Sequence, residues 1–93
     1  MRWMPSARRS RPRLSAREAI LALAAERGPD ATFCPSEAAR RMAEDWRPLM
    51  PEVRREADAL AAEGRLRVTQ GGGTVEAETA RGPIRLRLAR GAP

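Results

Sequence analysis

The sequence predicts an α+β fold in which three helices and one short strand come before an antiparallel β-hairpin. Apolar residues recur at helical spacing through the first two thirds of the chain. They then alternate with arginine at a spacing of two in RLRVTQ (65–70) and IRLRL (84–88). Prolines and glycines fall between these segments. The 93 residues, 42% of them hydrophobic, are enough for one small domain with a compact core.

The first helix is predicted over residues 15–27. Its start, SARE, is a capping box, in which the Ser15 hydroxyl accepts from the amide of Glu18 and the Glu18 carboxylate reaches back. Gly28, followed by a proline, ends it. Residues 31–33, Ala-Thr-Phe, are β-prone and bounded by prolines, so we expect one short strand there.

Two further helices are predicted over residues 35–44 and 50–63. Pro35 suits the first position of a helix, where its missing N–H costs nothing, and Pro51 allows a fresh start after the break at Trp-Arg-Pro. A stripe of apolar residues follows up to Gly64, a suitable C-terminal glycine. The third helix is therefore expected to pack one face on the core.

The remaining chain is predicted to form two half-buried strands joined by a long loop. Residues 71–73 are three glycines and suggest a flexible wing tip, and the polar run TVEAETAR follows them. The resulting order is helix, strand, helix, helix, strand, wing and strand, which is the order of a winged helix-turn-helix domain.

The blocks TFCPSEAAR, WRPLMP, VRREADALAAEG, VTQ and GPIRLR give the chain a resemblance to a known family. It resembles, over roughly residues 15–89, a family of small bacterial winged-helix domains catalogued as a domain of unknown function. The resemblance implies the winged-helix fold. It implies no catalytic or binding residues.

The net charge of +6 is concentrated at the two ends of the chain. Residues 1–17 carry six arginines and no acid. Residues 1–14 contain few apolar residues and two prolines, so we expect a disordered, arginine-rich arm ahead of a winged-helix domain over 15–90. A basic surplus of this kind favours a polyanionic partner, although it also serves solubility. The arm residues expected to reach such a partner are Arg8, Arg9, Arg11 and Arg13.

The residue inventory argues against an enzyme, a metal site or a cofactor. The chain has no histidine and one cysteine, so the usual nucleophile–base pairs and structural zinc sites cannot form. Cys34 is either a reactive thiol at a helix start or a small half-buried apolar residue. One cysteine forms no internal disulfide, and neither a secretory signal nor a membrane-spanning apolar run is present. We therefore expect a cytoplasmic protein.

Duplex DNA is the expected partner, because a winged helix places its third helix in the major groove. Arg55, with Arg54 and Arg47, is expected to face the groove, although four acids on the third helix weaken that expectation. The hairpin is the stronger element, since like charges opposite one another destabilise a sheet unless an anion relieves them. That anion is either a phosphate or Glu76 and Glu78 of the wing. The hairpin residues are Arg65, Arg67, Arg81, Arg85 and Arg87. A protein–protein module that uses the acidic face of the third helix is the alternative.

Overall fold

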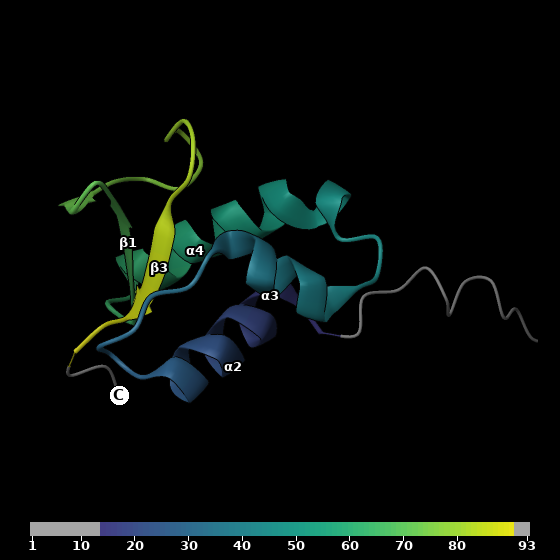
Figure 1. The fold of residues 1–93 in the computed structure, drawn as a ribbon, viewed down its shortest axis with the longest axis horizontal. Coiled ribbons are helices and arrows are strands. Elements are labelled where there is room, and N and C mark those ends of the chain that lie inside the picture. Colours follow the sequence, from purple (N-terminus) through teal and green to yellow (C-terminus); the bar gives the residue numbers. More distant parts are fainter. Residues whose placement is uncertain (1–13, 91–93) are drawn as a thin grey trace, which may run out of the picture.

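The computed structural model describes residues 14–90, which fold into three helices and a three-stranded antiparallel sheet, the winged-helix arrangement (Figure 1). The predicted α+β class is therefore confirmed. The predicted arm, residues 1–14, lies almost wholly outside the described residues. The elements are α2 (Ala16–Arg27), α3 (Pro35–Met42), the 3-10 turn η1 (Arg47–Leu49), α4 (Met50–Ala62), β1 (Leu66–Gln70), β2 (Gly73–Thr74) and β3 (Arg85–Leu88).

The first helix, α2, is closed at both ends by the residues that the sequence indicates. The Ser15 hydroxyl accepts from the N–H of Glu18 at 3.1 Å, and the Glu18 carboxylate accepts from the N–H of Ser15 at 2.9 Å. The predicted capping box is thus confirmed. Gly28 follows the last turn with φ of +75°, a backbone region that favours glycine.

The helical pair α3 and α4 is joined more tightly than predicted. Helix α3 ends at Met42, two residues before the predicted boundary, because Ala43 is already extended with φ of −163°. After a short bend, η1 forms a single 3-10 turn that runs directly into α4. The break expected around residues 46–48 is therefore partly a helical turn.

The sheet has the strand order β2-β1-β3, and its register places Val68 opposite Leu86. On its other side Leu86 exchanges two backbone hydrogen bonds with Phe33, at 2.9 and 2.8 Å. The short strand expected over 31–33 is thus a single bridging residue. This bridge attaches the chain just before α3 to the far edge of β3.

One hydrophobic cluster fills the space between the helices and the sheet. Phe33, Met42 and Leu60 are fully buried, and the apolar alternation of β1 and β3 adds Val68 and Leu86. Helix α4 contacts β1, and α2 contacts β3 (Figure 1). Within residues 14–90, no helix combines the length and the apolar character that crossing a bilayer requires.

The segment between β2 and β3 has no regular secondary structure, in agreement with the predicted long loop, but it is packed against the domain. Gly71 and Gly72 form a tight turn with positive φ, and β2 then pairs with the end of β1. We call residues 75–83 the wing segment. Its N–H of Val75 donates to the carbonyl of Val68 at 3.0 Å, and the side chain of Ala77 is fully buried. Because Ala77 belongs to the core, the wing segment is part of the packed domain.

Candidate nucleic-acid interface

Four arginines share the outer face of the hairpin, which we call the arginine face: Arg65, Arg67, Arg85 and Arg87. Alternate residues of a strand point to opposite sides, and the intervening Leu66, Val68 and Leu86 are buried. The arginine side chains therefore face away from the core. The register of β1 and β3 pairs Arg67 directly with Arg87, so two like charges lie opposite one another.

The arginine face is only partly neutralised by the rest of the described chain. Arg67 and Arg87 make neither an ion pair nor a side-chain hydrogen bond within residues 14–90. Arg65 lies 3.7 Å from the carboxylate of Glu63, a long and half-exposed contact. The centre of the face is therefore a directly opposed pair of cations.

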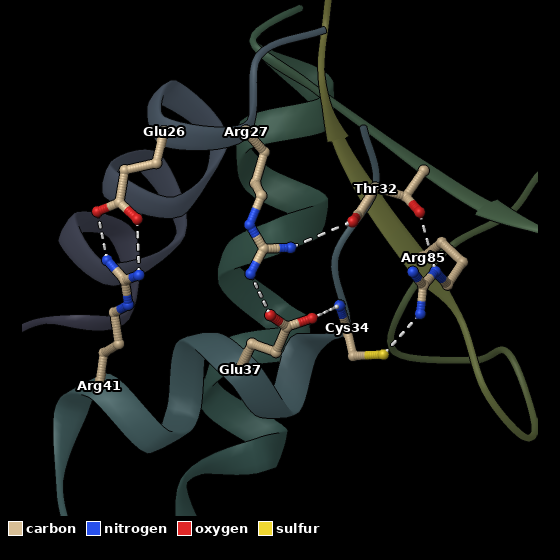
Figure 2. A network of polar contacts seen from close by, with 7 residues as sticks. All are labelled: Glu26, Arg27, Thr32, Cys34, Glu37, Arg41 and Arg85. Atoms are coloured by element: carbon tan, nitrogen blue, oxygen red, sulfur yellow. Dashed lines mark hydrogen bonds and ion pairs between the residues drawn. The ribbon is translucent and has the colours of Figure 1, made fainter. Parts of the chain in front are cut away.

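Arg85 connects the arginine face to the start of α3 (Figure 2). Its Nε donates to Oγ1 of Thr32 at 3.0 Å, and its Nη1 donates to Sγ of Cys34 at 2.8 Å. Cys34 is half-buried where the chain passes from Phe33 into α3. Arg85 therefore donates to Thr32 and Cys34, two residues of the domain itself, and its guanidinium group is directed at the start of α3.

A second set of arginines is bound by glutamates of α2 and α3, and it adjoins Arg85 through Thr32 and Cys34 (Figure 2). Arg27 donates to the Glu37 carboxylate at 2.5 Å, and the same carboxylate accepts from the N–H of Cys34 at 3.0 Å. The Cys34 N–H, together with Arg27, lowers the pKa of Glu37. Arg41 forms a two-pronged contact with Glu26 at 2.5 and 2.7 Å, which lowers the pKa of Glu26. These acids already neutralise their arginines.

Arg54, predicted to face a groove, is directed at the wing segment. Its Nη1 donates to the carbonyls of Ala77 and Ala80 at 2.7 and 3.2 Å, and its Nη2 donates to that of Gly82 at 3.3 Å. One turn further along α4, the carboxylate of Asp58 accepts from two wing N–H groups. The flank of α4 that carries both residues is therefore covered by the wing segment.

Arg55 and Arg47, the other two predicted groove residues, lie on exposed positions around the start of α4. Arg55 makes no ion pair within residues 14–90. The guanidinium of Arg47 lies 4.7 Å from the ring centroid of Trp46, and that of Arg40 lies 4.8 Å from the same centroid. Trp46 thus holds two cations by cation–π contact.

Most of the acids of α4, which weaken the expectation of DNA binding, have an ion-pair or hydrogen-bond partner within the described chain. Arg17 of α2 donates to Glu56 at 2.8 Å and to Glu63 at 3.0 Å. This contact lowers the pKa of Glu63 and raises that of Arg17. With Asp58 bonded to the wing, only Glu52 among the four acids has neither an ion pair nor a side-chain hydrogen bond within the described chain.

The wing offers one further exposed cation, Arg81, and its acids do not reach the arginine face. Glu76 accepts a bond of 3.4 Å from the hydroxyl of Thr79, and neither Glu76 nor Glu78 forms an ion pair within residues 14–90. In the same part of the chain, no three His, Cys, Asp or Glu side chains gather as a metal site would require. The arm residues Arg8, Arg9, Arg11 and Arg13 lie outside it.

The contacts of Arg54 and Asp58 with the wing segment are the feature that sequence reasoning missed. The pair is spaced i, i+4 with opposite charge, which on a helix usually means a surface ion pair. The only other signal was the presence of the apolar residues Val75, Ala77 and Ala80 within the polar run TVEAETAR. Neither signal identifies backbone groups about twenty residues away as the partners.

The comparisons with known proteins agree with the fold and add no activity. Residues 13–89 match the family described as "Protein of unknown function (DUF3253)". A search of curated proteins returns no match to the chain. The match spans the helices, the sheet and the wing segment, so every residue of the arginine face lies within it.

Proposed function

The chain belongs to the DUF3253 family, a protein family of unknown function, and we propose that it binds duplex DNA through the arginine face of its sheet. One observation carries the proposal: Arg67 and Arg87 are directly opposed and have no acid beside them in the described chain. Like charges in this position destabilise a sheet. A phosphate between the two guanidinium groups relieves that repulsion and accepts hydrogen bonds from both.

The environment of the wing favours a phosphate over an internal acid as the neutralising group. Glu76 and Glu78 were the only internal candidates that the sequence offered, and neither contacts an arginine within residues 14–90. Within residues 14–90 the pair therefore has no internal acid that neutralises it, and both cations are left for a phosphate.

The contacts made by the acids of α4 reduce the repulsion expected between this helix and the phosphates of DNA. Arg17 is shared between Glu56 and Glu63 and offsets one of their two charges, and both oxygens of Asp58 accept from wing N–H groups. Arg55 remains exposed on the same helix and is proposed to add a phosphate contact. Because most contacts in this scheme go to phosphates, we propose a binding mode with little dependence on base sequence.

The same contacts weigh against the alternative, a protein partner docked on the acidic face of α4. That face needs exposed carboxylates, and three of the four acids are occupied. We further propose that the protein acts as a cytoplasmic, non-enzymatic binder in a bacterial cell, which fits one cysteine and no histidine.

The salt dependence of binding by the full chain tests the proposal. The affinity for a duplex of mixed sequence is expected to fall with salt at a log–log slope of about −0.9 per phosphate contacted. Replacing both central arginines, Arg67→Gln/Arg87→Gln, removes the one phosphate contact that they share and is expected to flatten the slope by about 0.9. The matched control is Arg41→Gln/Arg90→Gln, which removes the same charge from arginines that already have acid partners.

Two results would contradict the proposal. The first is the absence of salt-dependent binding to duplex DNA at low salt. The second is an equal loss of affinity in the test and control variants, since this would mean that the net charge of +6 alone attracts the duplex.

A further inference from the structure

The wing segment is held in place by three side chains that are otherwise unexplained: Arg54, Asp58 and Gln70. We call them the wing clamp. Arg54 and Asp58 are one turn apart on α4, and Gln70 is the last residue of β1. The wing segment, which rises above α4 in Figure 1, is therefore gripped from both the helix and the sheet.

The first half of the wing segment is held through its N–H groups. The Asp58 carboxylate accepts from the N–H of Ala77 at 2.6 Å and from that of Glu78 at 3.0 Å. Ala77 is fully buried, so its amide has a partner that water cannot supply. Both carboxylate oxygens of Asp58 therefore bind the protein's own backbone.

The second half is held through its carbonyl groups. Gln70 donates from Nε2 to the carbonyls of Arg81 and Pro83, at 2.5 and 3.1 Å. Arg54 donates to the carbonyls on either side of Arg81, those of Ala80 and Gly82. Four consecutive carbonyls, 80–83, thus each accept a hydrogen bond from a side chain of the wing clamp.

The residue at the centre of this arrangement is Arg81. Its backbone is fixed on both sides, whereas its side chain is exposed and has neither an ion pair nor a side-chain hydrogen bond within residues 14–90. Fixing a backbone costs conformational entropy, and a loop fixed before binding does not lose that entropy on binding. An exposed arginine on a loop held in this way therefore loses little backbone entropy when it binds an anionic partner.

We propose that Arg54, Asp58 and Gln70 are positioning residues that hold Arg81 ready for a phosphate contact of its own. The inference rests on the proposed DNA binding. It assigns Arg54 an indirect part, in place of the direct groove contact that the sequence suggests. It also gives an acidic residue, Asp58, a favourable effect on the binding of a polyanion.

The effect of removing Asp58 distinguishes a positioning role from simple charge repulsion. Removing a carboxylate near DNA raises affinity if only charge matters, because it removes repulsion from phosphates. If Asp58 holds the wing, its removal lowers affinity in spite of the charge gained. Asp58→Asn supplies the matched control, since it removes the same charge but keeps one oxygen, which can accept from one of the two wing N–H groups.

The experiment measures duplex affinity and salt slope for five full-length chains: wild type, Asp58→Ala, Asp58→Asn, Arg81→Gln and the double variant Asp58→Ala/Arg81→Gln. Circular dichroism and a melting curve establish that each is folded. At 0.1 M salt one phosphate contact corresponds to about an eightfold change in affinity. Asp58→Ala and Arg81→Gln are each expected to weaken binding by about that factor and to flatten the slope by about 0.9.

The double variant and the asparagine variant complete the test. The double variant is expected to bind as Asp58→Ala does, since the two changes remove the same contact. Asp58→Asn is expected to bind more tightly than Asp58→Ala. Equal or tighter binding by both Asp58 variants, or fully additive losses in the double variant, overturns the positioning role while DNA binding stands. A wild type without salt-dependent duplex binding overturns both proposals.

Discussion

The opposed arginines of the sheet lead to a prediction about stability that needs no ligand. Arg67 and Arg87 are paired in the register of β1 and β3, and no acid contacts either of them in the described chain. The fold therefore contains a repulsion that one substitution removes. Arg87→Thr replaces one cation by a neutral residue with high β-propensity, so we expect the variant to be more stable than the wild type.

The size of the effect follows from the position of the pair. Side chains opposite one another start from Cβ atoms about 5 Å apart, and two unit charges at roughly 6 Å repel by about 0.7 kcal/mol in a water-like dielectric. Screening is weak at 0.01 M salt, where the Debye length is about 30 Å, and strong at 1 M, where it is about 3 Å. The gain is thus expected to be about 0.6 kcal/mol at low salt and about 0.1 kcal/mol at high salt.

Urea unfolding of the full chain at the two salt concentrations measures this gain. With a slope of about 1 kcal/mol/M for a small domain, the midpoint is expected to rise by about 0.6 M at low salt. Any gain from the β-propensity of threonine is the same at both concentrations, so the salt-dependent part isolates the repulsion. Arg87→Lys, which keeps the charge, and Arg81→Thr, which removes a charge from the wing, are the controls.

A gain of equal size at low and high salt would refute this reasoning, because it would leave no screened repulsion to relieve. A comparable salt-dependent gain from Arg81→Thr would refute it too, since the net charge of the chain would then be the cause. The expected pattern is a gain confined to Arg87→Thr and to low salt. The same variant is expected to lose duplex affinity, so that stability and binding change in opposite directions.

Three other predictions concern the fold. Ser15→Ala is expected to cost about 1 kcal/mol in urea unfolding by removing the cap of α2, and Ser15→Asn, which keeps a capping oxygen, much less. Phe33→Ala is expected to cost about 3–5 kcal/mol, because its side chain is fully buried; a loss under about 1 kcal/mol would contradict the packing described. Glu26, Glu37 and Glu63 have pKa values lowered in the fold, so the stability they contribute is complete above the ordinary glutamate value of about 4.3. It is lost as the pH falls further through the lowered values, and a urea midpoint that stayed constant or rose on acidification through this range would contradict the ion pairs.

The parts of the fold that local chemistry determines could be predicted from the sequence. Ser15 and Glu18 mark the start of α2 by mutual hydrogen bonds, and Gly28 marks its end by a backbone angle that suits glycine. The period-two alternation of the hairpin indicates which side chains are buried and that the arginines share the outer face, whereas the register Arg67↔Arg87 comes from the structure. In each case residues close in sequence, or a simple period, carry the signal.

The placement of the wing could not be predicted in the same way. Its segment is folded because Arg54, Asp58 and Gln70 bond to backbone groups far along the chain, and any sequence offers such groups. The contact of Arg85 with Cys34 likewise joins residues about fifty positions apart. Bonds between residues far apart in the sequence, whether to backbone or to side-chain atoms, leave no local pattern of residue types, so the sequence suggested a flexible wing and a groove-facing Arg54.

The most direct test of the central claim is a nuclear magnetic resonance titration of the isotopically labelled full chain with duplex DNA. The guanidinium Nε–Hε signals of the described arginines report separately on the arginine face, the wing and the ion-paired helices. We predict the largest shifts at Arg67 and Arg87, smaller ones at Arg81, and none at Arg41, which is bound to Glu26. Shifts confined to residues 1–13, or to the exposed side of α4 at Arg55, would contradict the claim that the sheet binds the phosphates.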